Sequence, residues 1–163
     1  MTIDTAKVMN DHDAHLVPTL VTYEADAKYG PSFGWNEENS SKNAEVLSAG
    51  LTSLENALSN NVNVGYGTDL CWSPKSYQGD GLLIHEKVCG AAEALRHCTL
   101  NNARIVRMEG KIGEITAGAH ADLVVLDTNP LKSMNCFSQK SNSIVAVLQA
   151  GLPVRDDKLL FDW

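Results

Sequence analysis

The first 106 residues alternate short apolar runs with longer helical patterns, and this alternation limits the folds open to the chain. Residues 15–23 and 62–66 are apolar runs of the kind that form buried strands. Between them, over residues 47–58, leucines recur at spacings of four, three and four, which is typical of an amphipathic helix. A second helical pattern covers residues 82–106. The order strand, helix, strand, helix predicts parallel βα units.

Residues that begin and end helices place several boundaries within this region. Ser40 and Ser41 are good N-cap residues for the helix that carries the leucines, and Asn60–Asn61 follows its last turn. We expect an earlier helix over Thr5–Ala14 and a polar loop over Glu24–Asn39. We also expect the last helical pattern to be broken at Cys98–Thr99.

After Arg107 the pattern changes to short β-rich runs. These runs cover residues 112–116, 121–127 and 143–149, and turn residues such as Gly118 and Gly151 separate them. The sequence therefore predicts a small β-rich module appended to the α/β units. We place the boundary near residues 107–112, which gives one domain over residues 1–110 and a second over residues 111–163.

Charge and composition exclude several classes of partner. The formal net charge is −7 and no cluster of Lys or Arg occurs, which argues against nucleic-acid binding and against an anionic membrane surface. No apolar run approaches the roughly 20 residues that a membrane-spanning helix needs. The four cysteines form no C-x-x-C pair, so we interpret them as free thiols in a reducing compartment. We expect a soluble, cytoplasmic protein.

Gly67–Thr68–Asp69, at the end of the second apolar run, is the most suggestive local feature. In a βα barrel, side chains at the carboxyl ends of strands point into the active site. An aspartate there can ligate a metal or take a proton from metal-bound water. The alternative is a turn or a helix cap, because Asp and Thr favour both.

The five histidines contain neither an H-x-H nor an H-E-x-x-H motif. His85 and Glu86 begin a helix after the Asp69 loop, so both could contact substrate; the alternative, which we favour, is a pair at a helix end. We expect His97 to be structural and His120 to be solvated. Motifs of serine hydrolases, P-loop proteins and dinucleotide-binding proteins are absent from the sequence.

Taken together, four motifs resemble those of one protein family, the amidohydrolase superfamily, in that family's order. Residues 113–131 resemble its C-terminal G-x-I-x-x-G-x-x-A-D-L-V-V-L-D-x-N-P-L signature, and residues 94–103 resemble its E-A-L-x-x-A-T-x-N-x-A helix. Leu16–Leu20 and Gly67–Asp69 resemble the V-P-T-L and G-T-D strands of its imidazolonepropionase-like and Xaa-Pro-dipeptidase-like branch. An ordered set of motifs is more specific than any one of them.

The resemblance implies an α/β fold, namely the C-terminal part of a (β/α)8 TIM-type barrel followed by strands of a small β-sandwich. It places residues 16–23 on the seventh barrel strand and residues 62–69 on the eighth. It also implies hydrolysis of C–N bonds in a small amide or peptide-like substrate. Asp69 then matches a metal ligand and general base, and the divalent metal is expected to be zinc.

Two departures from the family pattern affect these expectations. The family's other metal ligands lie on strands that precede the first residue of this chain, and one carboxylate cannot hold a catalytic metal. The segment Ile84–Ala94 is also shorter than the corresponding family helix, which puts the role of His85 and Glu86 in doubt. We therefore expect the chain to be inactive alone, and to need an N-terminal complementing chain or a homo-oligomer.

Other interpretations remain open at this point. The chain could be a non-enzymatic remnant or pseudoenzyme that acts as an interaction module, or an unrelated α/β binding domain. Trp35, Trp72 and Tyr77 lie in the loops expected near the site and hint at an aromatic pocket wall.

Overall fold

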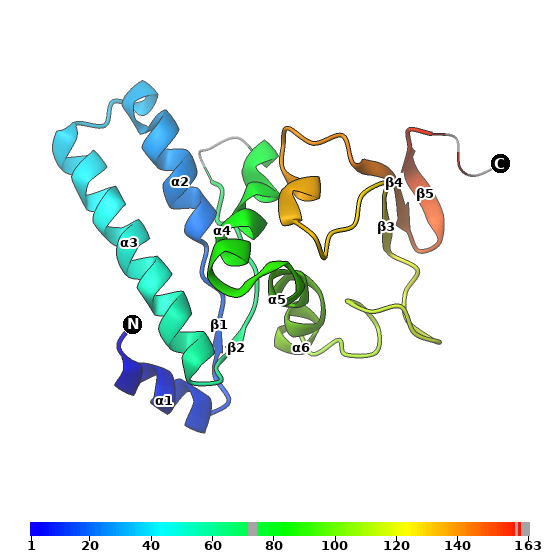
Figure 1. Cartoon of the computed structure of the whole chain (residues 1–163), viewed down its shortest axis with the longest axis horizontal. Helices are drawn as coiled ribbons and strands as arrows, with labels where there is room; N and C mark the ends of the chain where they lie inside the picture. Colours follow the sequence, from blue (N-terminus) through cyan, green and yellow to red (C-terminus); the bar gives the residue numbers. More distant parts are fainter. Residues whose placement is uncertain (72–74, 159, 161–163) are drawn as a thin grey trace.

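The computed structural model describes residues 1–71, 75–158 and 160. Helices surround two short central strands, and a small antiparallel sheet lies at the opposite end from the N-terminal helices (Figure 1). The elements of the helical part are α1 (Ile3–Asp11), β1 (His15–Leu16), α2 (Leu20–Tyr29), η1 (Gly30–Phe33), α3 (Glu37–Ser59), β2 (Asn63–Val64), η2 (Lys75–Gln78), α4 (Asp80–Cys89), α5 (Ala91–Arg96), η3 (His97–Asn101) and α6 (Asn102–Ile105).

The two central strands pair in parallel, as the βα pattern predicted. His15 pairs with Asn63 and Leu16 with Val64, and the Gly65 amide donates to the Leu16 carbonyl at 2.8 Å. The intervening helices α2 and α3 form the crossover that a parallel pair requires. Both strands are shorter than the apolar runs that predicted them.

The prediction of a β-rich run over residues 15–23 is wrong in its second half. Pro18 has no amide hydrogen to donate to a ladder, so β1 stops before it. Helix α2 begins at Leu20, and the buried side chains of Leu20, Val21 and Ala25 lie on its inner face. Apolar residues in a short run did not distinguish a buried strand from the first turns of a buried helix.

The predicted loop over Glu24–Asn39 and the predicted caps Ser40 and Ser41 are also wrong. The segment contains most of α2, the 3-10 turn η1 and the start of α3. The cap of α3 is Asn36, whose side chain accepts from the Asn39 amide at 2.9 Å, while the Asn39 side chain accepts from the Asn36 amide at 3.3 Å. This reciprocal capping box uses Asn at its third helical position where Glu or Gln is usual. The predicted helix end is confirmed by the C-cap at Asn60.

The main core lies where α1, α2, α3 and α4 pack around β1 and β2. Gly50 on α3 brings that helix close to α2, because a Cβ at this position would lie 2.4 Å from Leu20 Cδ2. The two helices run side by side at one end of the molecule (Figure 1). The buried members of this core are Ala6, Leu20, Val21, Ala25, Leu54, Ala57, Val62, Val64, Tyr77 and Ile84.

The last helical pattern, predicted over residues 82–106, is divided twice. Gly90 separates α4 from α5. Its φ of +82° is a conformation that would strain a residue with a Cβ, so glycine suits this position. The break expected at Cys98–Thr99 is a π-helical turn, η3, between α5 and α6. The sequence located this second irregularity correctly and missed the first.

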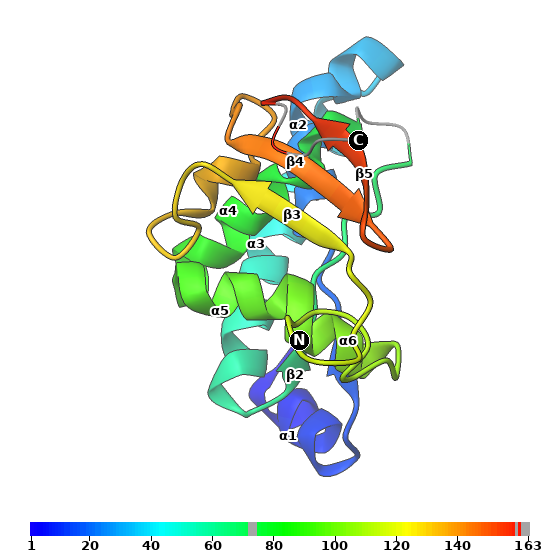
Figure 2. The same ribbon diagram turned by 90° about the vertical axis from the view of Figure 1, so that its right-hand side faces the viewer.

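The C-terminal part contains a three-stranded antiparallel sheet in the order β3 (Leu123–Leu126), β4 (Ile144–Gln149) and β5 (Leu152–Asp156) (Figure 2). Ala150 and Gly151 both have positive φ in the hairpin between β4 and β5, as a tight primed turn requires. Two of the three predicted β runs are confirmed, and the run at residues 112–116 is wrong because it is irregular in the structure. The domain division at residue 110 stays a prediction.

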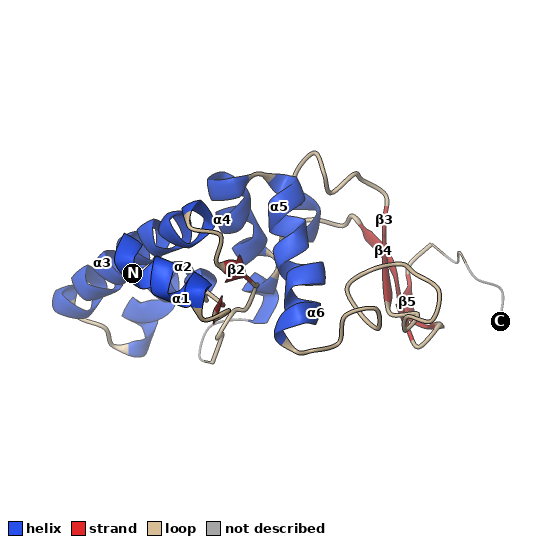
Figure 3. Ribbon diagram, turned by 90° about the horizontal axis from the view of Figure 1, so that it is seen from below, coloured by secondary structure: helices blue, strands red, loops and turns tan. Residues whose placement is uncertain are grey.

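Seen from below, the sheet extends away from the helices toward the C-terminus (Figure 3). Among the described residues, no helix combines the length and the apolar character needed to cross a bilayer.

Candidate functional site

Asp69 lies just beyond the carboxyl end of β2, on an exposed turn. Its φ is +51°, an uncommon conformation for a residue other than glycine that Asp tolerates better than most. The Thr22 hydroxyl, in the first turn of α2, donates to the Asp69 carbonyl at 3.1 Å. This bond joins the segments that follow β1 and β2, so the turn is fixed where the carboxyl ends of the two parallel strands meet.

Asp69 is exposed, and its carboxylate contacts the Cys71 thiol. The Cys71 thiol lies 3.5 Å from Asp69 Oδ1, and this contact with the carboxylate raises the pKa of Cys71. An exposed carboxylate at this position can accept a proton or contribute one oxygen ligand to a cation.

Within residues 1–71, 75–158 and 160, no group of three or more His, Cys, Asp or Glu side chains is arranged to hold a metal ion. A catalytic zinc takes about three protein ligands. Asp69 therefore fits the chemistry of a single ligand, and the described residues do not supply a complete set.

His85 lies in the interior, where it pairs with His97. The two Nδ1 atoms are 2.8 Å apart, so one ring donates to the other, and both side chains are at most 1% exposed. The ring of Tyr66 meets His85 edge to face at 5.4 Å. Among the described residues, neither Nε2 atom has a hydrogen-bond partner, and Glu93 lies 3.6 Å from that of His97.

Burial sets the protonation state of this pair. Desolvation, together with the positive charge that His97 would carry, lowers the pKa of His85 to about 4. Desolvation alone lowers the pKa of His97 to about 4. Both rings are therefore neutral near pH 7, and the pair behaves as part of the packing between α4 and η3.

Glu86, the other residue expected to contact substrate, connects α4 to the C-terminal part. Its Oε2 accepts from the Met134 amide at 3.1 Å and from the Ser133 hydroxyl at 3.3 Å. In the described part of the chain, the hydrogen bonds of Glu86 and the ring contacts of His85 do not involve Asp69. The substrate role of His85 and Glu86 stays a prediction.

His97 and His120 lie in the environments expected for them. His97 is fully buried, which fits the structural role predicted for it, and His120 is exposed. His12 follows α1, while His15 Nδ1 lies 3.2 Å from Asn63 Nδ2 across the β1–β2 pair.

The three aromatic residues suggested as a pocket wall do not form one in the described structure. Trp35 packs on Gly30, where a Cβ would lie 2.5 Å from its ring. Tyr77 is 9% exposed and lies beside a pocket, where the Lys28 ammonium donates to its hydroxyl at 2.6 Å. Trp72 lies outside the described residues. Sequence reasoning missed Lys28, because 49 residues separate it from Tyr77.

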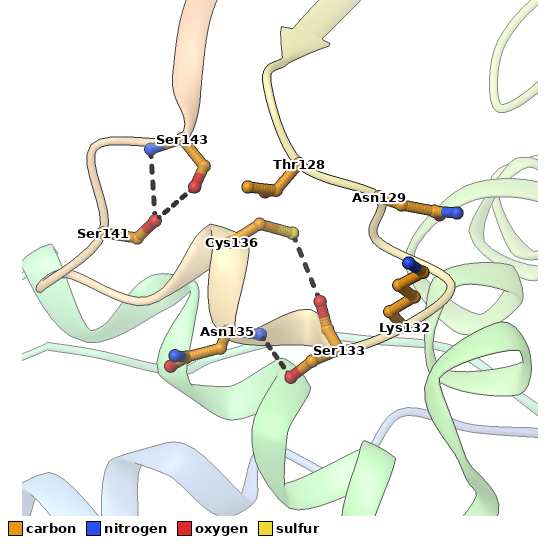
Figure 4. A pocket seen from close by; sticks show the side chains of 8 residues that line it. All are labelled: Thr128, Asn129, Lys132, Ser133, Asn135, Cys136, Ser141 and Ser143. Atoms are coloured by element: carbon orange, nitrogen blue, oxygen red, sulfur yellow. Dashed lines mark hydrogen bonds between the residues drawn. The ribbon is translucent and has the colours of Figure 1, made fainter.

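A polar pocket of about 260 Å³ lies in the segment between β3 and β4 (Figure 4). Hydroxyl and amide side chains form most of its wall, and Lys132 is the charged residue among them. Two of the wall residues, Ser141 and Ser143, bond to each other at 2.9 Å. We call it the β3–β4 pocket.

Comparison with known proteins identifies a family and several relatives of the chain. The sequence model of the Amidohydrolase family matches residues 1–154. The 5-methylthioadenosine/S-adenosylhomocysteine deaminase of Acetivibrio thermocellus is 29% identical over 133 residues, which is 70% of this chain and 31% of that protein. The 5'-deoxyadenosine deaminase of Methanobrevibacter smithii is 28% identical over 110 residues, which is 61% of this chain and 25% of that protein.

Solved structures agree over nearly the whole chain. A prolidase crystallised with N-methylphosphonate-L-proline is 40% identical, with a TM-score of 0.88 over 96% of this chain and 38% of that one. A crystal structure of an amidohydrolase is 37% identical, with a TM-score of 0.87 over 96% of this chain and 38% of the other. The chain thus spans well under half the length of the relatives that it matches.

Proposed function

Because the chain belongs to the amidohydrolase family, we propose that it forms the C-terminal part of a metal-dependent enzyme that hydrolyses carbon–nitrogen bonds. The names of its relatives support this reaction class, since deaminases and prolidases both act on C–N bonds. In this arrangement β1 and β2 are the last two strands of the (β/α)8 barrel, and α2 to α6 are the helices that follow them.

The position of Asp69 is the observation that carries the proposal. Chemistry in a βα barrel takes place at the carboxyl ends of the strands. The Thr22 bond fixes the Asp69 turn at that end of the parallel pair. We assign to Asp69 the roles of metal ligand and general base. Its carboxylate takes a proton from the attacking water and returns it to the leaving nitrogen.

A divalent cation, which we propose to be zinc, would supply Lewis acidity and lower the pKa of a water molecule. Asp69 would hold it through one oxygen, and the other ligands would come from outside this chain. The substrate would be a small amide, cyclic amide or peptide-like molecule, in keeping with the prolidase likeness.

The central sheet supports the expectation that this chain needs a complement. It contains two strands in the described residues, whereas a closed barrel has eight. We propose that an N-terminal chain, or a second copy, completes the enzyme, and that the chain alone is inactive.

The compartment we propose is the cytoplasm. All four cysteines are unpaired, with Cys71 exposed, which fits a reducing environment.

The proposal is tested by substituting Asp69→Asn in a longer protein that contains this chain. We expect C–N hydrolysis to fall about 10³-fold, in the range that the loss of a general base produces, with the fold retained. Asp13→Asn is the matched control, because Asp13 is also exposed with a positive φ, of +49°. It precedes β1 and pairs with Arg104 at 2.7 Å, so it lies at the other end of the strands.

Asp69→Asn with near-normal turnover would reject the assigned role. If the longer protein hydrolyses no C–N substrate with either residue at position 69, the non-enzymatic alternative, an interaction module, takes its place.

A further inference from the structure

A second pocket, of about 390 Å³, gathers lysines from three separate parts of the chain. Lys28 comes from α2, Lys87 from α4, and Lys140 from the segment before β4. Tyr77 and Ser138, each 9% exposed, also line it. We call this the lysine pocket.

Lys28 is held in place although its side chain is exposed. Its ammonium donates to the Tyr77 hydroxyl at 2.6 Å and lies 5.2 Å and 5.4 Å from the ring centroids of Tyr29 and Tyr77. The two rings meet edge to face at 5.8 Å. Fixing a lysine costs side-chain entropy, and here the phenol and the two ring faces offset that cost. One of the three ammonium hydrogens is used, so two remain for a ligand.

The side chains that line the lysine pocket carry more positive than negative charge. In the described part of the chain, none of Lys28, Lys87 and Lys140 forms an ion pair within 4.0 Å, whereas Lys7, Lys42 and Lys158 each do. Two carboxylates, Glu24 and Asp80, also line the pocket, and Asp80 accepts from Gln139 Nε2 at 2.8 Å. Three ammonium groups thus face two carboxylates, in a chain whose net charge is −7.

Such an arrangement favours an anionic ligand, because an anion that lies among several ammonium groups is attracted by each of them. A phosphoryl group carries close to two charges and three strong acceptor oxygens, which matches several lysine donors better than a single carboxylate does.

We propose that the lysine pocket binds the phosphoryl group of a small molecule. Lys28 supplies a fixed ammonium, and Lys87 and Lys140 close on the anion from α4 and from the opposite segment. Tyr77 positions Lys28. The inference does not depend on the hydrolytic role of Asp69, because none of its residues takes part in that proposal.

Calorimetric titration of the 163-residue chain with inorganic phosphate, at low ionic strength and mildly alkaline pH, tests the proposal. We expect saturable binding that weakens as NaCl is added, because exposed charges are screened. Lys28→Gln, Lys87→Gln and Lys140→Gln should each weaken binding about tenfold, the effect of losing one charge-assisted hydrogen bond. Circular dichroism establishes that each variant keeps the helical content of the unchanged chain.

Lys132→Gln is the matched control, because it removes one positive charge from the β3–β4 pocket of Figure 4 and leaves the lysine pocket intact. It should bind phosphate like the unchanged chain. The proposal would be overturned by an absence of saturable binding, by lysine-pocket variants that bind phosphate as tightly as the unchanged chain, or by loss of binding in Lys132→Gln. Acetate in place of phosphate should bind more weakly, and equal or tighter binding of acetate would reject the phosphoryl assignment.

Discussion

The helical part and the C-terminal sheet of this molecule bury their apolar residues very differently. Around β1 and β2, side chains such as Leu54, Ala57 and Val64 are at most 1% exposed. In the sheet, Val145 and Ala146 are buried, but Val154 and Leu152 are 62% and 65% exposed. A groove of about 510 Å³ also remains between the sheet and α5. The helical part has a core of its own, whereas the sheet leaves apolar surface uncovered.

The same distinction applies to two groups of titratable side chains. Some have all their contacts within this chain, and others need groups from outside it. The buried histidine pair belongs to the first class, because its protonation and contacts are settled inside the chain. Asp69 belongs to the second, because it is exposed and, among the described residues, is not part of a group of three or more side chains that could hold a metal.

The largest expected effect is on the helical core. Leu54→Ala removes a fully buried side chain and should lower the free energy of unfolding by about 2–5 kcal/mol, from lost transfer energy and the cavity left behind. Leu152→Ala, on the exposed face of the sheet, should change it by less than about 0.5 kcal/mol. Denaturant unfolding followed by circular dichroism measures both. Equal losses would show that the two regions are equally well packed.

The histidine pair should make the helical part sensitive to acid. The pKa of each ring is lowered from 6.5 to about 4, so below pH 6.5 the unfolded chain binds protons that the folded chain does not. This contribution to stability should be constant above about pH 7.5 and fall toward pH 4, by on the order of 3 kcal/mol for each ring. Unfolding free energy measured across this range gives the slope.

Replacing both rings isolates their contribution to that slope. The double variant His85→Leu/His97→Leu should flatten it, and His120→Leu, which alters an exposed ring, should leave it unchanged. A slope that survives the double variant would assign the acid sensitivity to carboxylates elsewhere.

A smaller effect is expected where the two regions are joined. Glu86→Gln weakens the bonds from Ser133 and Met134 and should cost about 1 kcal/mol of stability. Glu45→Gln, an exposed position on α3, serves as the control. Hydrogen exchange should show faster opening of residues 133–137 in Glu86→Gln. Unchanged exchange there would mean that other contacts hold the sheet to α4.

Local sequence rules recovered the elements that depend on neighbours in the chain. The leucine spacing located α3, the asparagines located its end, and short β-rich runs located β3 and β4. The rules failed where tertiary packing decides, as at Leu20–Tyr23, whose apolar residues bury as a helix rather than a strand. Strand β5 was missed because Pro153, which has no amide hydrogen for a ladder, argues against a strand in so short a run.

For the site, the sequence identified Asp69 and could not identify its surroundings. The turn is held by Thr22, a residue 47 positions away, through a contact that only the folded chain creates. The same holds for the Lys28–Tyr77 and His85–His97 pairs, whose partners come from different helical segments. Apolar runs located the two parallel strands, and the family motifs supplied their expected place as the seventh and eighth strands of a barrel.

Zinc binding measured by equilibrium dialysis tests the central claim most directly, with the chain alone and with the chain joined to the preceding part of the barrel. The account predicts weak, substoichiometric zinc on the isolated chain, and tight stoichiometric zinc on the joined protein that is weakened by Asp69→Asn and kept by Asp13→Asn. Tight stoichiometric zinc on the isolated chain, or undiminished affinity in the joined Asp69→Asn protein, would contradict it.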